Sequence, residues 1–324
     1  MLAQLGRRAV AGAAVVVGVV TLTFFLVQLA PGDPVERLLG PSATPAQLAA
    51  GRRALGLDRP VATQYVIWLG RVARGDWGRS IATGRPARDV LADALPATVT
   101  LVGLSLVLSY MLGLALGAWQ AGADSRVDTA VSITTVTLFA LPGYWLGLML
   151  VMAFTYWAHW LPAFGAAGLD ADALTGWSRY ADRLRHLALP LATLTLIGVG
   201  GVARYARGAV RDVRSQPFVR TARAKGLSAW QVTRRHVARN ALIPIVTLVG
   251  LSLPALFSGA VFVEAVFAWP GVGRRLVEAV QARDYPVVMA ATTVTALLVV
   301  TANLLTDLGV AWIDPRIRHG SRVT

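Results

Sequence analysis

Long apolar stretches constrain this chain more than any other feature of its sequence. Six of them hold no more than one charged residue each, and they lie at approximately 9–30, 95–120, 129–158, 187–206, 241–263 and 287–311. The hydrocarbon core of a bilayer is about 30 Å thick and is crossed by about 20 apolar residues in an α-helix. The sequence therefore predicts an all-α polytopic membrane protein with six transmembrane helices.

The overall composition agrees with a membrane protein. Hydrophobic residues make up 55% of the chain and charged residues only 15%, whereas soluble domains carry about 25% charged residues. A net charge of +14 is compatible with nucleic-acid or membrane binding, but here the charges lie between the apolar stretches, which favours a membrane. The absence of cysteine excludes disulfides and thiolate chemistry. The first apolar run has no small-residue cleavage site, so we predict a retained span rather than a signal peptide.

The distribution of basic residues predicts the orientation of the spans, because cytoplasmic loops are enriched in Arg and Lys. The segment 204–239 holds ten basic residues and one acid, Asp212. The loops 159–186 and 264–286 each hold three basic and three acidic residues. Both ends of the chain are also basic, and six spans place them on the same side as 204–239. We therefore expect both termini to be cytoplasmic.

These spans divide the chain into four parts. They are 1–30, the N-terminal cytoplasmic end and first span; 31–94, an extracytoplasmic cap loop; 95–311, a five-span core with a basic cytoplasmic segment at 207–240; and 312–324, a cytoplasmic tail. The loop 31–94 carries nine Arg and six acidic residues, but at 64 residues it is about long enough to be translocated regardless of charge. Its helical apolar spacing and its Gly and Pro turns predict a small folded cap. Without histidine or cysteine, it is not a separate catalytic domain.

The basic segment contains clear helix start and stop signals. Pro217 suits the first position of a helix, and Gly226 suits the position just after a helix end. Ser228 and Gln231 have the spacing of a capping box at the start of a second helix. The sequence therefore predicts a short helix, a glycine turn and another helix that leads into the fifth span.

Two interpretations of this segment compete. Its arginines could anchor the chain on anionic lipid, each contributing about 1 kcal/mol near the surface. The charges are, however, interleaved with the small residues Thr221, Ala222, Ala224 and Gly226, which would form one closely packing face. Such a face suits a short helix that binds in a groove of another protein.

The residues of this segment resemble a known motif. "RTARAKGL" at 220–227, followed by "RNALIP" at 239–244, is similar to the cytoplasmic coupling motif of ABC-importer permeases, in the form found in the dipeptide/oligopeptide (nickel-type) family. The general motif begins Glu-Ala-Ala and places glycine six positions after the Glu. Arg220 stands in place of that Glu, Ala222 matches the second Ala, and Gly226 is retained.

The resemblance extends over almost the whole chain. Five further stretches match the same family: "LAPGDP" at 29–34, "GLDRP" at 56–60, "GDWGRS" at 75–80, "RDYPVV" at 283–288 and "DPRIR" at 314–318. It implies the fold of a type I ABC-importer permease in a bacterial plasma (inner) membrane.

By this resemblance the chain would move di- or oligopeptides by alternating access, as one of two homologous permease chains. The expected partners are two ATP-binding subunits, an extracytoplasmic substrate-binding protein, the peptide substrate and membrane lipid, but no nucleic acid. ATP and Mg²⁺ would bind on the ATP-binding subunits, and no cofactor on this chain. The helix at 217–226 would couple the chain to an ATP-binding subunit through Phe218, Arg220, Thr221, Ala222, Arg223, Ala224, Lys225, Gly226 and Leu227. A nickel chelate or a glutathione-like solute is an alternative substrate.

The sequence lacks the motifs of common catalytic sites. A phosphate-binding loop needs Gly-Lys-Ser/Thr, but Lys225, the only lysine, follows alanine and precedes glycine. The four histidines, His159, His186, His236 and His319, have no paired metal-ligand spacing. We therefore predict a transport subunit that is not an enzyme and holds no metal, with ATP hydrolysis on partner chains.

Three other classes of protein would have different features. A proton-coupled secondary transporter would show paired half-repeats or a relay of buried carboxylates. A membrane enzyme would need convergent nucleophile, acid or metal groups. A passive membrane anchor would leave the helix at 217–226 dispensable.

Polar residues inside spans are candidate functional groups. Asp307 and Asn303 lie one turn apart in the sixth span, and Glu264 lies at the end of the fifth. Each ionisable group could instead be an interfacial residue that reaches water. The pairs Gly113/Gly117 and Gly143/Gly147 have the spacing that lets helices approach closely.

Overall fold

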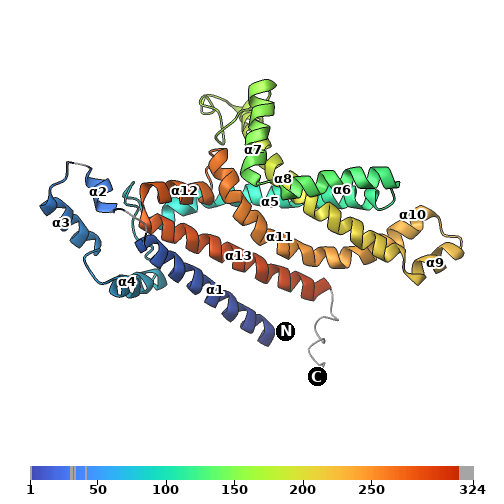
Figure 1. Cartoon of the computed structure of the whole chain (residues 1–324), viewed down its shortest axis with the longest axis horizontal. Helices are drawn as coiled ribbons and strands as arrows, with labels where there is room; N and C mark the ends of the chain where they lie inside the picture. The colour runs from blue at the N-terminus through green and yellow to red at the C-terminus, as the bar shows by residue number, and fades with distance from the viewer. Residues whose placement is uncertain (1, 30–31, 33, 41, 314–324) are drawn as a thin grey trace. The chain divides into compact units, whose positions relative to one another are not determined.

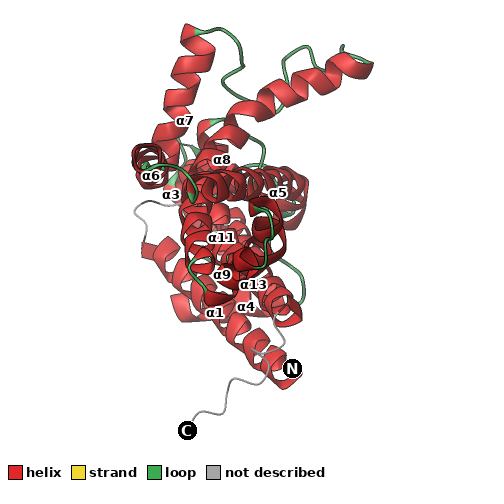
Figure 2. Cartoon of the chain, turned by 90° about the vertical axis from the view of Figure 1, so that its right-hand side faces the viewer, coloured by secondary structure: helices red, strands yellow, loops and turns green. Residues whose placement is uncertain are grey.

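A computed structural model of the chain describes residues 2–29, 32, 34–40 and 42–313. These residues form helices joined by turns and loops, with one isolated antiparallel bridge between Arg79 and Pro86 (Figure 2). The predicted all-α class is therefore confirmed for the described part of the chain. The stretch "DPRIR" and the rest of the predicted tail from residue 314 lie outside the described residues.

Four helices are long and apolar enough to cross a bilayer, judged by length and composition. They are Gly6–Leu29 within α1 (Leu2–Leu29), α5 (Ala87–Gln120), α8 (Gly176–Arg214) and Tyr285–Gly309 within α13 (Tyr285–Ile313). They contain, almost entirely, the first, second, fourth and sixth predicted spans. Four of the six predicted spans are thus present as continuous helices.

The third predicted span, 129–158, is broken. It consists of α6 (Ser125–Ala140) and, after a bend of 103°, α7 (Gly143–Val151). α7 continues into the π-helical η1 (Met152–Trp157). The break lies at Pro142, which has no N–H to continue the helical hydrogen bonds and which disfavours a helical conformation in the residue before it. Leu141 is accordingly extended, with ψ of 136°.

The fifth predicted span, 241–263, lies within α11 (Arg239–Val266), a helix of 28 residues. Within it, the stretch Ser252–Val266 is apolar but shorter than a span. The described helices therefore supply four spans, or five if the bent pair crosses as one. The sixth remains a prediction.

The chain divides into two compact units. One is built around Thr100–Trp269, and the other combines Gly6–Val99 with Pro270–Val300. The segment 31–94, predicted as a small folded cap, shares a unit with most of α1 and with the beginning of α13.

The first unit is organised around α8, against which α6, α7 and α11 pack. A Cβ atom on Gly117 of α5 would lie 2.3 Å from the carbonyl oxygen of Ala203 in α8, and one on Gly113 would lie 2.7 Å from the Cβ atom of Val202. Glycine at both positions lets α5 and α8 approach closely, as the sequence spacing predicts. At the far end of α8 the chain turns into α9 (Pro217–Ala224) and α10 (Ala229–Val232) (Figure 1).

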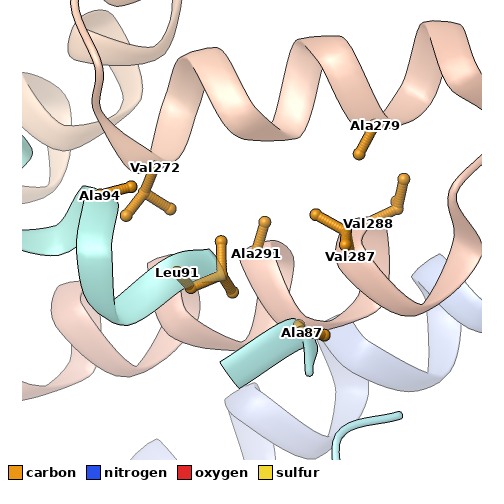
Figure 3. Packing of buried hydrophobic residues seen from close by; sticks show 9 residues of the cluster. Ala87, Leu91, Ala94, Val272, Ala279, Val287, Val288 and Ala291 are labelled. Carbon is orange, nitrogen blue, oxygen red and sulfur yellow. The ribbon is translucent and has the colours of Figure 1, made fainter. Parts of the chain in front are cut away.

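The second unit contains α2 (Pro34–Leu39), α3 (Pro45–Leu55), α4 (Val61–Ala73) and α12 (Val272–Ala282), with the start of α5 and of α13. Its core joins α5, α12 and α13 through small and branched side chains (Figure 3): Ala87, Leu91, Ala94, Val272, Ala279, Val287, Val288, Ala290 and Ala291. The Thr98 hydroxyl accepts a hydrogen bond of 2.9 Å from the backbone N–H of Val272, at the first residue of α12. Small side chains at these positions let the three helices pack tightly.

In the same unit α1 runs along α13 in the opposite direction (Figure 1). A Cβ atom on Gly12 would lie 2.5 Å from a methyl group of Val300, near the end of this unit's part of α13. Towards the other end of α1, Val20 and Phe24 pack with Met289, near the beginning of α13. The end of α1 and the beginning of α13 therefore lie at the same end of this helix pair.

Candidate functional site

The short helix predicted in the basic segment is α9, with Pro217 at its first position. The chain leaves the helix through Gly226, whose φ of 80° is left-handed and whose N–H donates to the carbonyl oxygen of Arg223 at 3.0 Å. Glycine adopts this conformation at low cost, whereas residues with a Cβ atom are strained in it. Both predicted boundaries are confirmed.

The second predicted helix is also present. The Ser228 hydroxyl accepts from the N–H of Gln231 at 3.3 Å, and the Gln231 side chain accepts from the N–H of Ser228 at 3.0 Å. This is the predicted capping box at the start of α10. The chain then continues through the π-helical η2 (Thr233–Ala238) directly into α11.

One face of α9 is buried within the chain itself. Val219 is fully buried and Ala222 is 5% exposed. They share a cluster with Val210 of α8, Val232 of α10, Val237 of η2 and Ala241 of α11. Ala222 was predicted to contact a partner protein, and this prediction is wrong: its small side chain lets α9 lie close to the chain's own helices.

The opposite face of α9 and the turn after it are open to solvent. Of the predicted coupling residues, those that are exposed are Phe218, Arg220, Thr221, Arg223, Ala224, Lys225 and Gly226, while Leu227 is half-buried. The exposed face combines three cations with one aromatic ring that is 42% exposed. A surface of this kind is accessible to a partner protein, and the packed inner face holds it in a fixed orientation.

The end of α8 that leads to α9 is held by an ion cluster. Asp128, in the first turn of α6, accepts from Nε and Nη2 of Arg207, and its carboxylate lies 3.0 Å from Nη2 of Arg211. Charged hydrogen bonds with two parallel donors fix geometry as well as contributing energy. Gln120 of α5 also donates, to the carbonyl oxygen of Asp128 at 3.0 Å.

Sequence reasoning missed this cluster. The arginines of α8 were interpreted as lipid anchors, because Arg207 lies 79 residues from Asp128 in sequence. The available signal was Asp128 itself, an acid next to the start of a predicted span.

A groove of about 650 Å³ runs along α8 and α11, the two helices that flank the α9–η2 segment. Its α8 wall extends from Leu194 to Asp212 and its α11 wall from Leu248 to Gly259. Four glycines widen it: Gly198, Gly201, Gly208 and Gly259. Arg204 and Phe139 both line the groove, and the Arg204 guanidinium lies 4.8 Å from the centroid of the Phe139 ring.

The three predicted intramembrane polar residues lie in different surroundings. Glu264 is completely buried, so within this chain it does not reach water as an interfacial residue would. Asn303 is exposed and Asp307 is partly buried. Among the described residues, no three His, Cys, Asp or Glu side chains come close enough together to hold a metal ion. The absence of a metal or cofactor stays a prediction.

Three of the short stretches that carry the resemblance meet in the second unit. Ser80, at the end of "GDWGRS", donates its hydroxyl to the carboxylate of Asp284 in "RDYPVV". In "LAPGDP", Gly32 has a φ of +106°, and a Cβ atom there would overlap the guanidinium of Arg283. These three stretches, which are far apart in sequence, therefore lie together in this unit.

Solved structures of transporters contain chains with a similar fold. The fold resembles that of a chain of the MetNI methionine ABC transporter, with a TM-score of 0.57 and 16% identity over 69% of this chain and 96% of that one. It also resembles a chain of an amino acid ABC transporter, with a TM-score of 0.54 and 14% identity over 69% of this chain and 94% of that one. The chain thus has the predicted fold class, that of a type I ABC-importer permease.

The sequence defines the family. Residues 109–319 match the family described as "Binding-protein-dependent transport system inner membrane component", and residues 1–102 match "Binding-prot-dependent transport system membrane comp, N-term". The chain belongs to this family of inner-membrane transport components. The family resemblance inferred from the motifs is confirmed.

Several curated relatives match along nearly their whole length. The oligopeptide transport system permease AppB of Bacillus subtilis is 36% identical over 98% of this chain and 100% of its own length. The probable D,D-dipeptide transport permease DdpB of Escherichia coli is 38% identical over 94% of both chains. The di/tripeptide transport permease DppB of Pseudomonas aeruginosa is 37% identical over 93% of this chain and 94% of its own.

Gly226→Val tests the turn that ends α9. Since nothing lies within 4 Å of a Cβ atom at this position, the cost arises from the left-handed backbone alone and should be about 1 kcal/mol or more. We expect membrane insertion to survive while transport falls. Transport by proteoliposomes measures this, with Gly226→Asn as the milder control because Asn tolerates the left-handed region better. Equal transport by the valine variant and the wild type would contradict a role for this turn.

Proposed function

We propose that this chain is the transmembrane permease subunit of an ATP-driven importer that moves di- or oligopeptides across a bacterial inner membrane. The relatives support the substrate class, since they are named as oligopeptide, D,D-dipeptide and di/tripeptide transport permeases. The single structural observation that supports coupling is the orientation of α9. Its apolar face packs onto its own chain, and its cationic face is exposed to solvent.

The proposal includes the partners that such a chain needs. A second homologous permease chain completes the pore, and two ATP-binding subunits lie on the cytoplasmic side. ATP and Mg²⁺ bind on those subunits. An extracytoplasmic substrate-binding protein delivers the peptide, and both termini of this chain are cytoplasmic.

Coupling follows from the helices that α9 contacts. The exposed face of α9 lies in a cleft of one ATP-binding subunit, so closure of that subunit displaces α9. Because Val219 and Ala222 are packed against α8, η2 and α11, the ends of α8 and α11 move with α9. The same two helices form the walls of the groove of about 650 Å³. Their displacement opens or closes that groove, which is the basis of alternating access.

The exposed face of α9 provides the test. The double substitution Arg223→Glu/Lys225→Glu reverses two exposed charges without touching the buried face. Since like charges facing each other across an interface cost several kcal/mol, we expect ATP-driven peptide uptake by the reconstituted complex to fall by at least about tenfold. Arg126→Glu/Arg234→Glu makes the same charge change at two exposed arginines outside α9 and should retain uptake.

The same assay separates the alternatives. Uptake that continues without ATP and stops when a proton gradient is dissipated would establish a proton-coupled secondary transporter instead. Competition for uptake by a dipeptide, by a nickel chelate and by glutathione distinguishes the three substrate classes. Strong competition by the nickel chelate alone would contradict the peptide assignment.

A further inference from the structure

Another cavity lies in the second unit, far in sequence from α9. It has a volume of about 280 Å³ and is bounded by the end of α1, the end of α3, α4 and the beginning of α13. Its wall is apolar, with Phe24, Val27, Ile67, Trp68 and Met289 among the lining residues. None of the roles proposed above uses this cavity.

The cavity lies where two candidate membrane spans end. Phe24 and Val27 belong to the last turns of the span in α1, and Met289 belongs to the first turns of the span in α13. Trp77 and Tyr285 also line the cavity. Aromatic residues of this kind are enriched at the level of lipid headgroups.

The helix α4 packs against the side of α1. The Tyr65 hydroxyl is 2.7 Å from the hydroxyl of Thr21, which lies two turns before the end of α1. The rings of Tyr65 and Phe25 are 5.7 Å apart between centroids. α4 also exposes Val66, at 67%, and Leu69, at 38%. These apolar side chains continue the exposed, lipid-facing surface of α1, which includes Phe25 at 42%.

The rim of the cavity is cationic. Arg53, Arg59 and Arg71 line it, together with a single acid, Asp76. Asp76 lies 3.8 Å from Arg71, a weak pair at this exposure, and no described carboxylate pairs with Arg53 or Arg59. The indole N–H of Trp68, which also lines the cavity, is buried without a hydrogen-bond partner among the described residues.

We propose that this cavity binds the phosphate headgroup of an anionic phospholipid, with the acyl chains against α1 and α4. An apolar wall continuous with a lipid-facing helix and a rim of arginines together match an anionic amphiphile. Arginine is well suited to the phosphate because its planar donors bind two oxygens at once. A peptide arriving from water matches the charge of the rim but leaves the exposed apolar residues of α4 uncovered.

Native mass spectrometry of the purified chain in mild detergent tests the site. Phosphatidylglycerol and phosphatidylcholine with identical acyl chains are added separately, and the bound fraction is measured. We expect phosphatidylglycerol to bind in preference. Arg53→Gln/Arg59→Gln should weaken its binding by about tenfold or more, since basic residues near the surface contribute strongly to anionic-lipid binding.

Arg74→Gln/Arg88→Gln is the matched control. It removes two exposed arginines of the same unit that do not line the cavity, and it should leave phosphatidylglycerol binding unchanged. Equal binding of the two lipids to the wild type would overturn the proposal, as would an equal loss in both double variants. Displacement of phosphatidylglycerol by glycerol phosphate would assign the cavity to a soluble phosphate, and displacement by a dipeptide would assign it to the substrate.

Discussion

Ala222→Glu is expected to unfold the α9–α10 segment and to abolish transport, the largest effect predicted for a single substitution in this region. Ala222 is 5% exposed and packs among the apolar side chains of the cluster that joins α9 to α8, α10 and α11. A glutamate there would be an overpacked and unpaired buried charge, which costs at least about 3 kcal/mol. Limited proteolysis of the purified complex would detect the loosened segment, and uptake assays would detect the loss of function.

Ala224→Glu is the matched control, since it introduces the same side chain two residues further along on the exposed face. It should leave the segment resistant to protease. The two variants also separate two roles of α9. If Ala222→Glu kept the segment intact and only released the ATP-binding subunit, the buried placement of Ala222 would be wrong.

Asp284→Ala is expected to lower the stability of the second unit by a comparable free energy. The carboxylate of Asp284 is buried, and it accepts from the Ser80 hydroxyl and from the N–H groups of Ile81 at 3.1 Å and Ala82 at 3.2 Å. It also accepts from the N–H of Val287 at 3.4 Å, in the first turn of α13. Alanine would leave these donors without an acceptor, at a cost of about 3 kcal/mol.

The thermal unfolding midpoint in detergent measures this loss. A fall of roughly 4–5 °C corresponds to about 3 kcal/mol for a chain of 324 residues, since the entropy of unfolding is about 2.1 cal/mol/K per residue. Asp93→Ala is the control because Asp93 is 65% exposed in its pair with Arg85, and exposed pairs contribute about 1 kcal/mol or less. Similar unfolding midpoints for the two variants would show that Asp284 does not stabilise the segment 80–82.

Features governed by neighbouring residues were predictable from the sequence. Pro217 and Gly226 fix the two ends of α9, and Ser228 and Gln231 cap α10 through bonds that span three residues. The four continuous spans follow from length and hydropathy in the same way. The break between α6 and α7 was also signalled locally, by Pro142, but a hydropathy criterion alone passes over a proline inside a long apolar run.

Features governed by distant residues were not predictable. Small residues lie on several faces of α9, so the sequence could not show that Ala222 faces α8 and α11 while Ala224 faces solvent. Ser80 and Asp284 are 204 residues apart, and nothing in either short stretch indicates that they meet. The groove along α8 and α11 likewise depends on how two long helices cross.

The length of α8 has a mechanical consequence. Its 39 residues extend about 58 Å at 1.5 Å per residue, nearly twice the roughly 30 Å of a hydrocarbon core. The helix is therefore long enough to project beyond a membrane, and one of its ends leads into α9. No loop separates its two ends, although Pro190 removes one of its backbone hydrogen bonds. In the proposed coupling, a displacement of α9 therefore reaches the far end of α8 along a single helix.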